Sequence, residues 1–319
     1  MEKYTCEYID FELVDKYMQI INNSKRDAEF KDLNNKIDLD FLNQSDLIEN
    51  IKSKMPVKDL LQDPNIKVLR MYPSLAVKTN NLKSGHTDNI LYNYNDVDTD
   101  EIEKYRVDRL KDTRLVIFNA DTGDEVTIHT SGHLVAIDNT LREARNARRD
   151  AKAGIKRPLT DVFILDVINC NILGLDIAQY RSKYFCSSIS VEGAKWTPVR
   201  GERVDERMTE LLNWYNNETE LHPLIRAAIL HAEFIKIHPF PDGNGRTARL
   251  LVNYELVKNA YPTITIKAKN KRQYIEALED AVMNHDVTKL VKMFKKCMLL
   301  REEFYLRHFE QQEIAEPQR

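Results

Sequence analysis

The chain has 319 residues, of which 30% are charged and 42% hydrophobic, as in a globular protein with one large or two modest domains. Its formal net charge of −3 gives no overall field for nucleic acid or an anionic membrane, and its 4 scattered cysteines lack the spacing of a metal or disulfide framework. Since the first residues lack an apolar signal-peptide core and no apolar run approaches the roughly 18 residues of a membrane span, we expect a cytoplasmic protein that spans no membrane.

Residues 1–130 predict a small α+β region. Two weakly amphipathic helical stretches come first, with their apolar residues at helical spacing: Phe11, Leu13, Val14 and Tyr17, then Leu39, Phe41, Leu42, Leu47, Ile48 and Ile51. Alternation over 66–72 allows a strand, and 113–119 with 125–130 predicts a β-hairpin around a Gly-containing turn. The sequence leaves open whether this region recognises a target, regulates, or only extends the structure.

A helical domain is expected over residues 131–312, followed by a frayed tail at 313–319. Its first helix, LVAIDNTLREARNARRDAKAG, should be interrupted or capped around Asp138 and Asn139. A second, LTDVFILDVINCNILGL, begins after Thr160, a good N-cap residue. Strand-like sequence surrounds residues 188–193, and amphipathic helices are expected near 206–217 and over 223–237.

The stretch His238-Pro-Phe-Pro-Asp-Gly-Asn-Gly-Arg-Thr-Ala-Arg249 lies between that last helix and another over 245–259. Gly243 and Gly245 permit close approach to the backbone, and the start of the second helix offers free N–H groups to an anion. Arg246 and Arg249, three residues apart, can fork onto phosphate oxygens. Asp242 is suited to hold Mg²⁺ beside phosphates.

His238 can accept a proton near neutral pH, which completes the set needed for phosphoryl or nucleotidyl transfer. Each part also has an ordinary interpretation: a loop histidine, an Asp-Gly-Asn-Gly turn, and surface arginines in salt bridges. The combination of all of them within one short segment favours the functional interpretation.

The segment resembles the signature of the Fic-domain family, His-x-Phe-x-(Asp/Glu)-Gly-Asn-Gly-Arg-x-x-Arg, at every defined position. The resemblance implies transfer of AMP from ATP to a hydroxyl of a target protein, and it extends over roughly the last 190 residues. It implies a mainly α fold, a Fic-type helical bundle with a β-hairpin flap, preceded here by the small α+β region.

The resemblance also assigns roles to residues. His238, Asn244 and Arg246 would be catalytic, with His238 deprotonating the target hydroxyl, and Asp242 would hold Mg²⁺. ATP would be bound by the loop and by a tyrosine in a later helix near the adenine: Gly243, Asn244, Gly245, Arg246, Arg249 and Tyr274. Phe240 would pack in the core. The flap that aligns the target by strand addition would contain Ser188, Ile189, Ser190 and Val191.

Many family members carry an inhibitory helix with the pattern (Ser/Thr)-x-x-x-Glu-(Gly/Asn), whose glutamate pairs with the second arginine of the signature, here Arg249. Residues 188–193 match the pattern but fall in the expected flap, so we interpret that match as coincidence. A degenerate version at Leu134–Asn139 stands about a hundred residues before His238. It predicts a weakened clamp between Asp138 and Arg249, with Asn139 beside it.

The expected function is therefore a protein adenylyltransferase that uses Mg-ATP and acts on a Ser, Thr or Tyr hydroxyl. Removal of AMP, another nucleotide donor, and a non-catalytic nucleotide-binding regulator stay open as alternatives. A DNA-binding regulator is disfavoured because no basic recognition helix stands out and the net charge is negative. A homodimer is left open.

Overall fold

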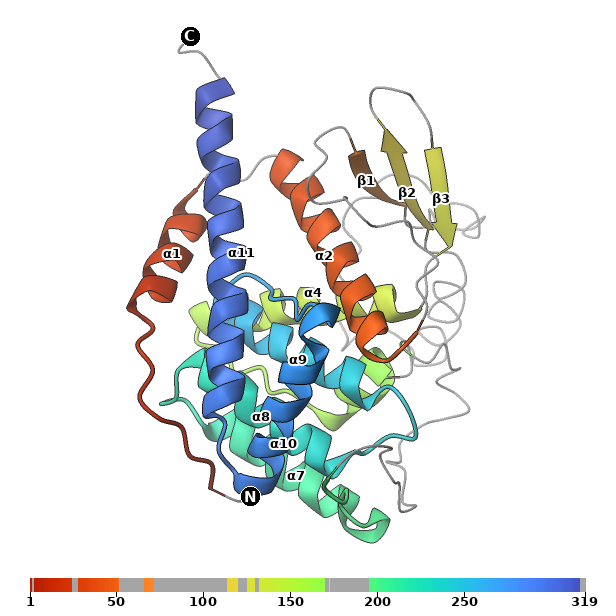
Figure 1. Ribbon diagram of the computed structural model, residues 1–319, viewed down its shortest axis with the longest axis vertical. Helices are drawn as coiled ribbons and strands as arrows, with labels where there is room; N and C mark the ends of the chain where they lie inside the picture. The colour runs from red at the N-terminus through yellow and green to blue at the C-terminus, as the bar shows by residue number, and fades with distance from the viewer. Residues whose placement is uncertain are drawn as a thin grey trace.

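The computed structural model describes residues 1, 3–24, 28–51, 66–71, 114–119, 125–129, 132–169, 172 and 195–315. These residues are mainly helical, as the sequence predicts (Figure 1). The α-helices are α1 (Glu12–Asn23), α2 (Ala28–Ile48), α4 (Gly132–Lys152), α7 (Val204–Asn217), α8 (Pro223–Ile237), α9 (Asn244–Lys258), α10 (Lys271–Asn284) and α11 (Thr288–Ala315). The other elements are strands β1 (Ile66–Met71), β2 (Arg114–Asn119) and β3 (Glu125–His129), the π-helix η2 (Phe163–Asn169), and the 3-10 helices η3 (Gly201–Arg203) and η4 (Ala268–Asn270).

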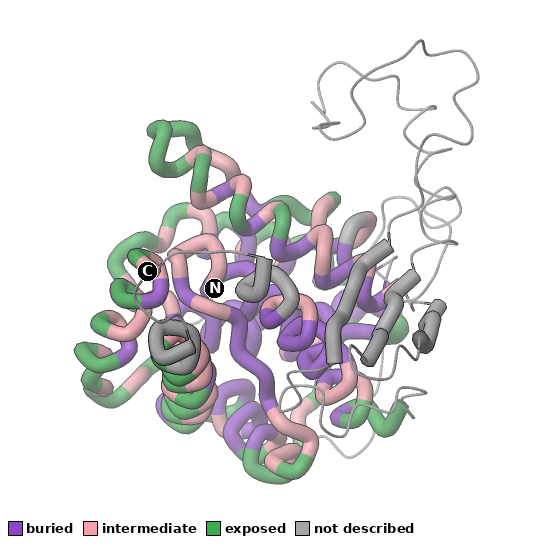
Figure 2. The backbone as a smooth tube through the Cα atoms, turned by 90° about the horizontal axis from the view of Figure 1, so that it is seen from above, coloured by how far each residue is buried: buried purple, intermediate pink, exposed green. Residues whose placement is uncertain are grey.

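Helix α8 is the centre of the bundle. Pro223 occupies its first turn, where no backbone donor is lost, and His222 caps it by accepting the N–H of Leu224 at 3.2 Å. Most of its residues are buried, because α7, α9, α10 and α11 all pack against it. Figure 2 shows buried backbone gathered in the middle of the molecule and exposed residues on the outer turns. The loop that follows α8 therefore starts from a rigid element.

The two N-terminal helices belong to the same body as the later ones. α1 lies against α11, and α2 contacts α4 and α9 (Figure 1). Val14 of α1 and Leu39 and Leu42 of α2 are buried in the main hydrophobic core. The division of the chain at residue 130 stays a prediction, but α1 and α2 are packed on the helices that follow that position.

The three strands form one antiparallel sheet in the order β1-β2-β3. Ile66 pairs with Asn119 at one end of the β1–β2 ladder, and Arg114 pairs with His129 in β2–β3. The strands lie where the alternating sequence predicted them, beside α2 in Figure 1. The turn at 120–124 and the expected flap at 188–191 lie outside the described residues.

The structure corrects one expectation about helices. The interruption around Asp138 and Asn139 was wrong, because α4 continues unbroken through them. The Asn139 side chain accepts a hydrogen bond from Arg142 one turn further on, so its amide does not compete with the helical backbone. The C-terminal helix α11 is described as far as Ala315, and the frayed tail from 313 stays a prediction.

Candidate active site

His238 ends α8 in a left-handed backbone conformation, with φ 56° and ψ 57°. This conformation is uncommon for a residue with a side chain and turns the chain sharply into the loop. The imidazole Nδ1 lies 3.3 Å from the carbonyl oxygen of Ile235, so Nδ1 carries the proton and Nε2 is left as an acceptor. Burial lowers the pKa of His238, although the Ile235 carbonyl opposes that shift. The ring is therefore neutral at neutral pH and able to accept a proton.

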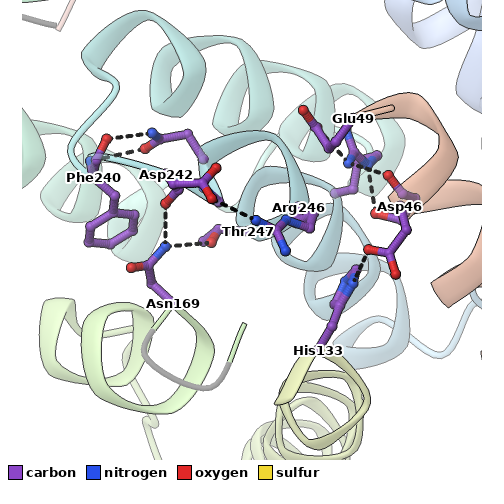
Figure 3. A network of polar contacts seen from close by, with 12 residues as sticks. Asp46, Glu49, His133, Asn169, Phe240, Asp242, Arg246 and Thr247 are labelled. Atoms are coloured by element: carbon purple, nitrogen blue, oxygen red, sulfur yellow. Dashed lines mark hydrogen bonds and ion pairs between the residues drawn. The ribbon is translucent and has the colours of Figure 1, made fainter. Parts of the chain in front are cut away.

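The loop is held by bonds from one asparagine side chain. Asn244 accepts the backbone N–H of Phe240 at 3.0 Å and donates to its carbonyl oxygen at 2.6 Å. The Phe240 ring is buried against Phe234, with 6.0 Å between the ring centroids. From η2, Asn169 donates to the Asp242 carbonyl at 3.0 Å (Figure 3). The loop conformation is thus fixed before any ligand arrives, which favours catalysis by positioning.

Gly243 precedes α9 with φ 78°, a conformation that suits glycine, and α9 begins at Asn244. The free N–H groups of the first turn of α9 and its dipole provide a site for an anion. Arg246 is 8% exposed and donates to Asp242 Oδ2 at 3.1 Å, while its buried Nε has no hydrogen-bond partner among the described residues. The Asp242 carboxylate itself is largely exposed to solvent.

The second arginine is occupied by the end of α2. Arg249 is only 3% exposed, and it donates to Ser45 Oγ and to the Ser45 carbonyl, each at 3.0 Å. It also donates to Glu49 Oε1 at 2.8 Å. A Cβ built on Gly245 would stand 2.2 Å from the same Glu49 oxygen, so the carboxylate lies against the glycine backbone at the start of α9. The described structure therefore has an internal anion where phosphate binding was expected.

The carboxylate on Arg249 belongs to Glu49, directly after α2, whereas the sequence predicts Asp138 of α4. The degenerate motif at Leu134–Asn139 is the one that stands at the expected distance before His238, and the prediction of Asp138 rests on that distance. Ser45-Asp-Leu-Ile-Glu49-Asn50 satisfies (Ser/Thr)-x-x-x-Glu-(Gly/Asn) at every defined position, and this signal was overlooked. The structure brings Glu49 to Arg249 because α2 ends beside α9.

The first turn of α4 is attached to the same end of α2. His133 is 1% exposed, and its Nδ1 lies 2.9 Å from Asp46 Oδ1 (Figure 3). Burial lowers the pKa of His133, the Asp46 bond opposes that shift, and the nearby Arg246 and Arg249 lower the pKa further. Asp46, between Ser45 and Glu49, thus ties α2 to α4, the helix that carries Asp138 and Asn139.

Tyr274 of α10 lies next to Arg249. It is 1% exposed, and its hydroxyl is 2.8 Å from Nε2 of His231, a buried residue of α8. Burial raises the pKa of Tyr274, while the neighbouring Arg249 opposes that shift. The contact with adenine expected for Tyr274 stays a prediction; in this structure the ring belongs to the core.

Comparison with known proteins identifies the domain. Residues 166–256 match the model of the Fic/DOC family. The chain contains a Fic domain. The protein adenylyltransferase fic-1 of Caenorhabditis briggsae is 38% identical to it over 179 residues, 47% of this chain and 35% of the relative. A probable protein adenylyltransferase of Aquifex aeolicus is 37% identical over 142 residues, 44% of this chain and 43% of the relative. The chain thus matches less than half the length of either relative.

Solved structures show the same fold. A Fic-domain-containing signaling protein from Bacteroides thetaiotaomicron superimposes with a TM-score of 0.60 at 22% identity, over 93% of this chain and 96% of that one. Fic-1 of Caenorhabditis elegans, residues 134–508, gives a TM-score of 0.54 at 17% identity, over 93% of this chain and 70% of that one. At these identities the likeness establishes the fold alone. The mainly helical Fic fold predicted from the sequence is therefore confirmed.

Two features are absent from the residues that the structure describes. No described helix is both long enough and apolar enough to cross a membrane. Among the residues that the structure describes, no group of three or more His, Cys, Asp or Glu side chains could hold a metal ion by itself.

Proposed function

We propose that the Fic domain of this chain transfers AMP from Mg-ATP to a hydroxyl side chain of a target protein. The observation that carries the proposal is the fixed loop between α8 and α9. It joins a neutral histidine, whose Nε2 is left as an acceptor, to a helix start with a buried arginine. Relatives named protein adenylyltransferase support the same reaction.

In the proposed reaction His238 Nε2 accepts the proton of the target hydroxyl. The hydroxyl oxygen forms a bond to the α-phosphorus of ATP, the bond from that phosphorus to the bridging oxygen of the β-phosphate breaks, and pyrophosphate leaves. Arg246 and the N–H groups of Gly245 and its neighbours stabilise the phosphate charge, which is the main protein contribution to this type of transfer. Asn244 acts by holding the loop.

Asp242 suits a magnesium ion bound mainly by phosphates. Its carboxylate is 74% exposed and offers hard oxygen ligands, and a single carboxylate with phosphate oxygens and water is a common magnesium site. Bound there, the ion would neutralise charge on the phosphates. Oδ1 of Asp242 accepts the Gly243 N–H at 2.6 Å and Oδ2 accepts from Arg246, which fixes the orientation of the carboxylate.

The proposal includes autoinhibition by Glu49 in place of Asp138. The Glu49 carboxylate neutralises Arg249 and covers the backbone of Gly245, so a triphosphate in the productive position would meet a like charge there. The sequence points to Asp138 as the inhibitory residue. We propose Glu49 in its place, because Glu49 supplies the carboxylate that is bonded to Arg249.

The test is intact-mass analysis after incubation with Mg-ATP, with and without a candidate target. We expect an added AMP on the wild-type protein or the target, no adduct with His238→Ala, and a faster reaction with Glu49→Ala. Loss of a general base costs about 10²–10⁴-fold in rate. Asp138→Ala is the matched control, because it removes a carboxylate of α4 that the proposal does not use, and it should react like wild type.

Other outcomes separate the alternatives. Strong transfer by His238→Ala would refute the assigned base, and acceleration by Asp138→Ala but not by Glu49→Ala would refute the Glu49 clamp. If every variant, with a target present, binds ATP without forming an adduct, AMP transfer is the wrong reaction. Binding of other nucleotides and removal of AMP from modified protein would then be measured. The cytoplasmic location, the hydroxyl type and a homodimer stay predictions.

A further inference from the structure

A cationic cavity lies between α2, the segment that leads into η4, α10 and α11. Its volume is about 410 Å³, within the range of small-molecule sites. Its charged lining consists of cations with one carboxylate: Lys267, Lys292, Lys296, Arg301, Arg307 and Asp40. Met293, Leu300 and Phe304 add apolar walls. The local balance is strongly positive although the chain is negative overall.

Arg301 makes this cavity more than a group of surface lysines. It is 7% exposed, and its one described hydrogen bond goes from Nη2 to Thr265 Oγ1 at 2.9 Å. No carboxylate of the described residues forms an ion pair with it. A buried guanidinium without a counter-charge is costly, and an anion in the cavity would supply that charge. Lys296 and Arg307, both exposed, also lack a described ion pair and stand at the rim.

The cavity is joined to α2 through Lys267. Its Nζ donates to both oxygens of Asp40, at 2.7 and 2.6 Å, and the next residue, Ala268, donates its N–H to Gln44 Oε1 at 2.7 Å. Asp40 and Gln44 are on α2, within three turns of Glu49. An anion in the cavity would compete with Asp40 for Lys267, because one ammonium cannot fully neutralise both.

We propose that this cavity binds a small phosphorylated molecule. Its binding would loosen the contacts of α2 with Lys267 and Ala268, and α2 ends beside the loop between α8 and α9. The deep guanidinium of Arg301 would bind phosphate oxygens, Lys296 and Arg307 would hold the outer charge, and Met293 and Phe304 would contact an apolar part of the ligand. The effect on α2 rests on the proposed inhibitory role of Glu49, whereas binding in the cavity does not.

Calorimetric titration at low salt with inorganic pyrophosphate as the probe tests the site. All proteins carry Arg246→Ala, so that binding at the start of α9 is weakened and AMP transfer plays no part in the readout. We expect Lys296→Glu to weaken binding by about tenfold or more, because it reverses a charge at the rim. Arg301→Gln should weaken it as well. Lys289→Gln, which removes an exposed cation of α11 that does not line the cavity, should leave it unchanged.

Lys296→Glu alters an exposed side chain and should fold normally, so the proposal can be tested even if Arg301→Gln unfolds. No binding at millimolar pyrophosphate, or equal binding by Lys296→Glu and Lys289→Gln, would overturn the site. Hydrogen exchange of residues 40–49 tests the link to α2: pyrophosphate should accelerate exchange in the Arg246→Ala protein and not after Lys296→Glu. Binding without that change would overturn the link alone, and neither result depends on whether the domain transfers AMP.

Discussion

At the scale of single residues, the close approach of Glu49 to Gly245 gives a prediction about stability. A methyl group at Gly245 would stand 2.2 Å from Glu49 Oε1 and 3.2 Å from the Arg249 guanidinium. In wild type, Gly245→Ala must therefore displace Glu49 and should lower the free energy of unfolding. In a Glu49→Ala background the clash is gone, and replacing glycine by alanine in a helix should stabilise by up to about 1 kcal/mol.

Denaturant unfolding of the four proteins of this double-mutant cycle measures the difference. The coupling between the two substitutions should be about 1 kcal/mol or more, as found for residues in direct contact. An equal effect of Gly245→Ala in both backgrounds would show that Glu49 does not rest on this glycine in solution.

His238 gives a prediction about pH. Burial lowers its pKa from the ordinary 6.5, so the ring takes up a proton only below that value. Because the base must be neutral, single-turnover AMP transfer by Glu49→Ala should be independent of pH above 6.5 and should fall as the pH drops further. A pH–rate profile with its acidic half-maximum above 6.5 would contradict the environment described for this histidine.

The sequence predicts the part of the site that lies in one segment. It does not predict the contacts that only folding brings together. Residues from His238 to Arg249 lie in one segment, so their spacing alone predicts the loop, the helix start and the two arginines. Glu49 is 200 positions before Arg249, and only packing of α2 beside α9 brings them together. The inhibitory pattern occurs in the sequence at 45–50 and at 188–193 and in degenerate form at 134–139, and no local feature shows which of them reaches Arg249.

At the scale of helices, a buried ionic group joins α7, α8 and α9. Glu255 of α9 is fully buried and receives the Tyr215 hydroxyl of α7 at 2.5 Å. Nη2 of Arg226 on α8 lies 3.3 Å from the same carboxylate oxygen and donates to the Tyr215 carbonyl at 3.4 Å. Burial raises the pKa of Glu255, and Arg226 opposes that shift. The helices α8 and α9, which flank the loop, are thus joined to each other and to α7 by this buried group.

Arg226→Met should therefore lower the free energy of unfolding by about 3–5 kcal/mol, since it leaves Glu255 buried without its cation. Arg272→Met is the matched control, because Arg272 pairs with Glu276 on the surface of α10 and such pairs contribute about 0–1 kcal/mol. Urea unfolding compares them. Similar small losses for both would mean that the buried pair contributes no more than an exposed one.

At the scale of the whole molecule, the junction of α1 with α11 contains a carboxyl group without a hydrogen-bond partner. Glu302 is buried at 0% exposure, and neither of its side-chain oxygens has a partner among the described residues. Burial, and then the negative Asp15 of α1, raise the pKa of Glu302 to about 8. Asp15 accepts a hydrogen bond from the Tyr261 hydroxyl at 2.5 Å and lies 3.2 Å from His222 Nε2. The Asp15 carboxylate therefore has polar partners at this junction, unlike that of Glu302.

The folded chain should consequently hold a proton on Glu302 that the unfolded chain releases near its ordinary pKa of 4.5. The contribution of this group to stability is complete below that pH and is lost as the pH rises through about 8. Glu302→Gln, which mimics the protonated acid, should therefore be more stable than wild type at pH 8 by a larger margin than at pH 5, in urea unfolding. Glu303→Gln, the exposed neighbour, should show no such growth. A margin that is the same at both pH values would mean that Glu302 is ionised in the folded chain, and that α1 packs against α11 with a charge between them.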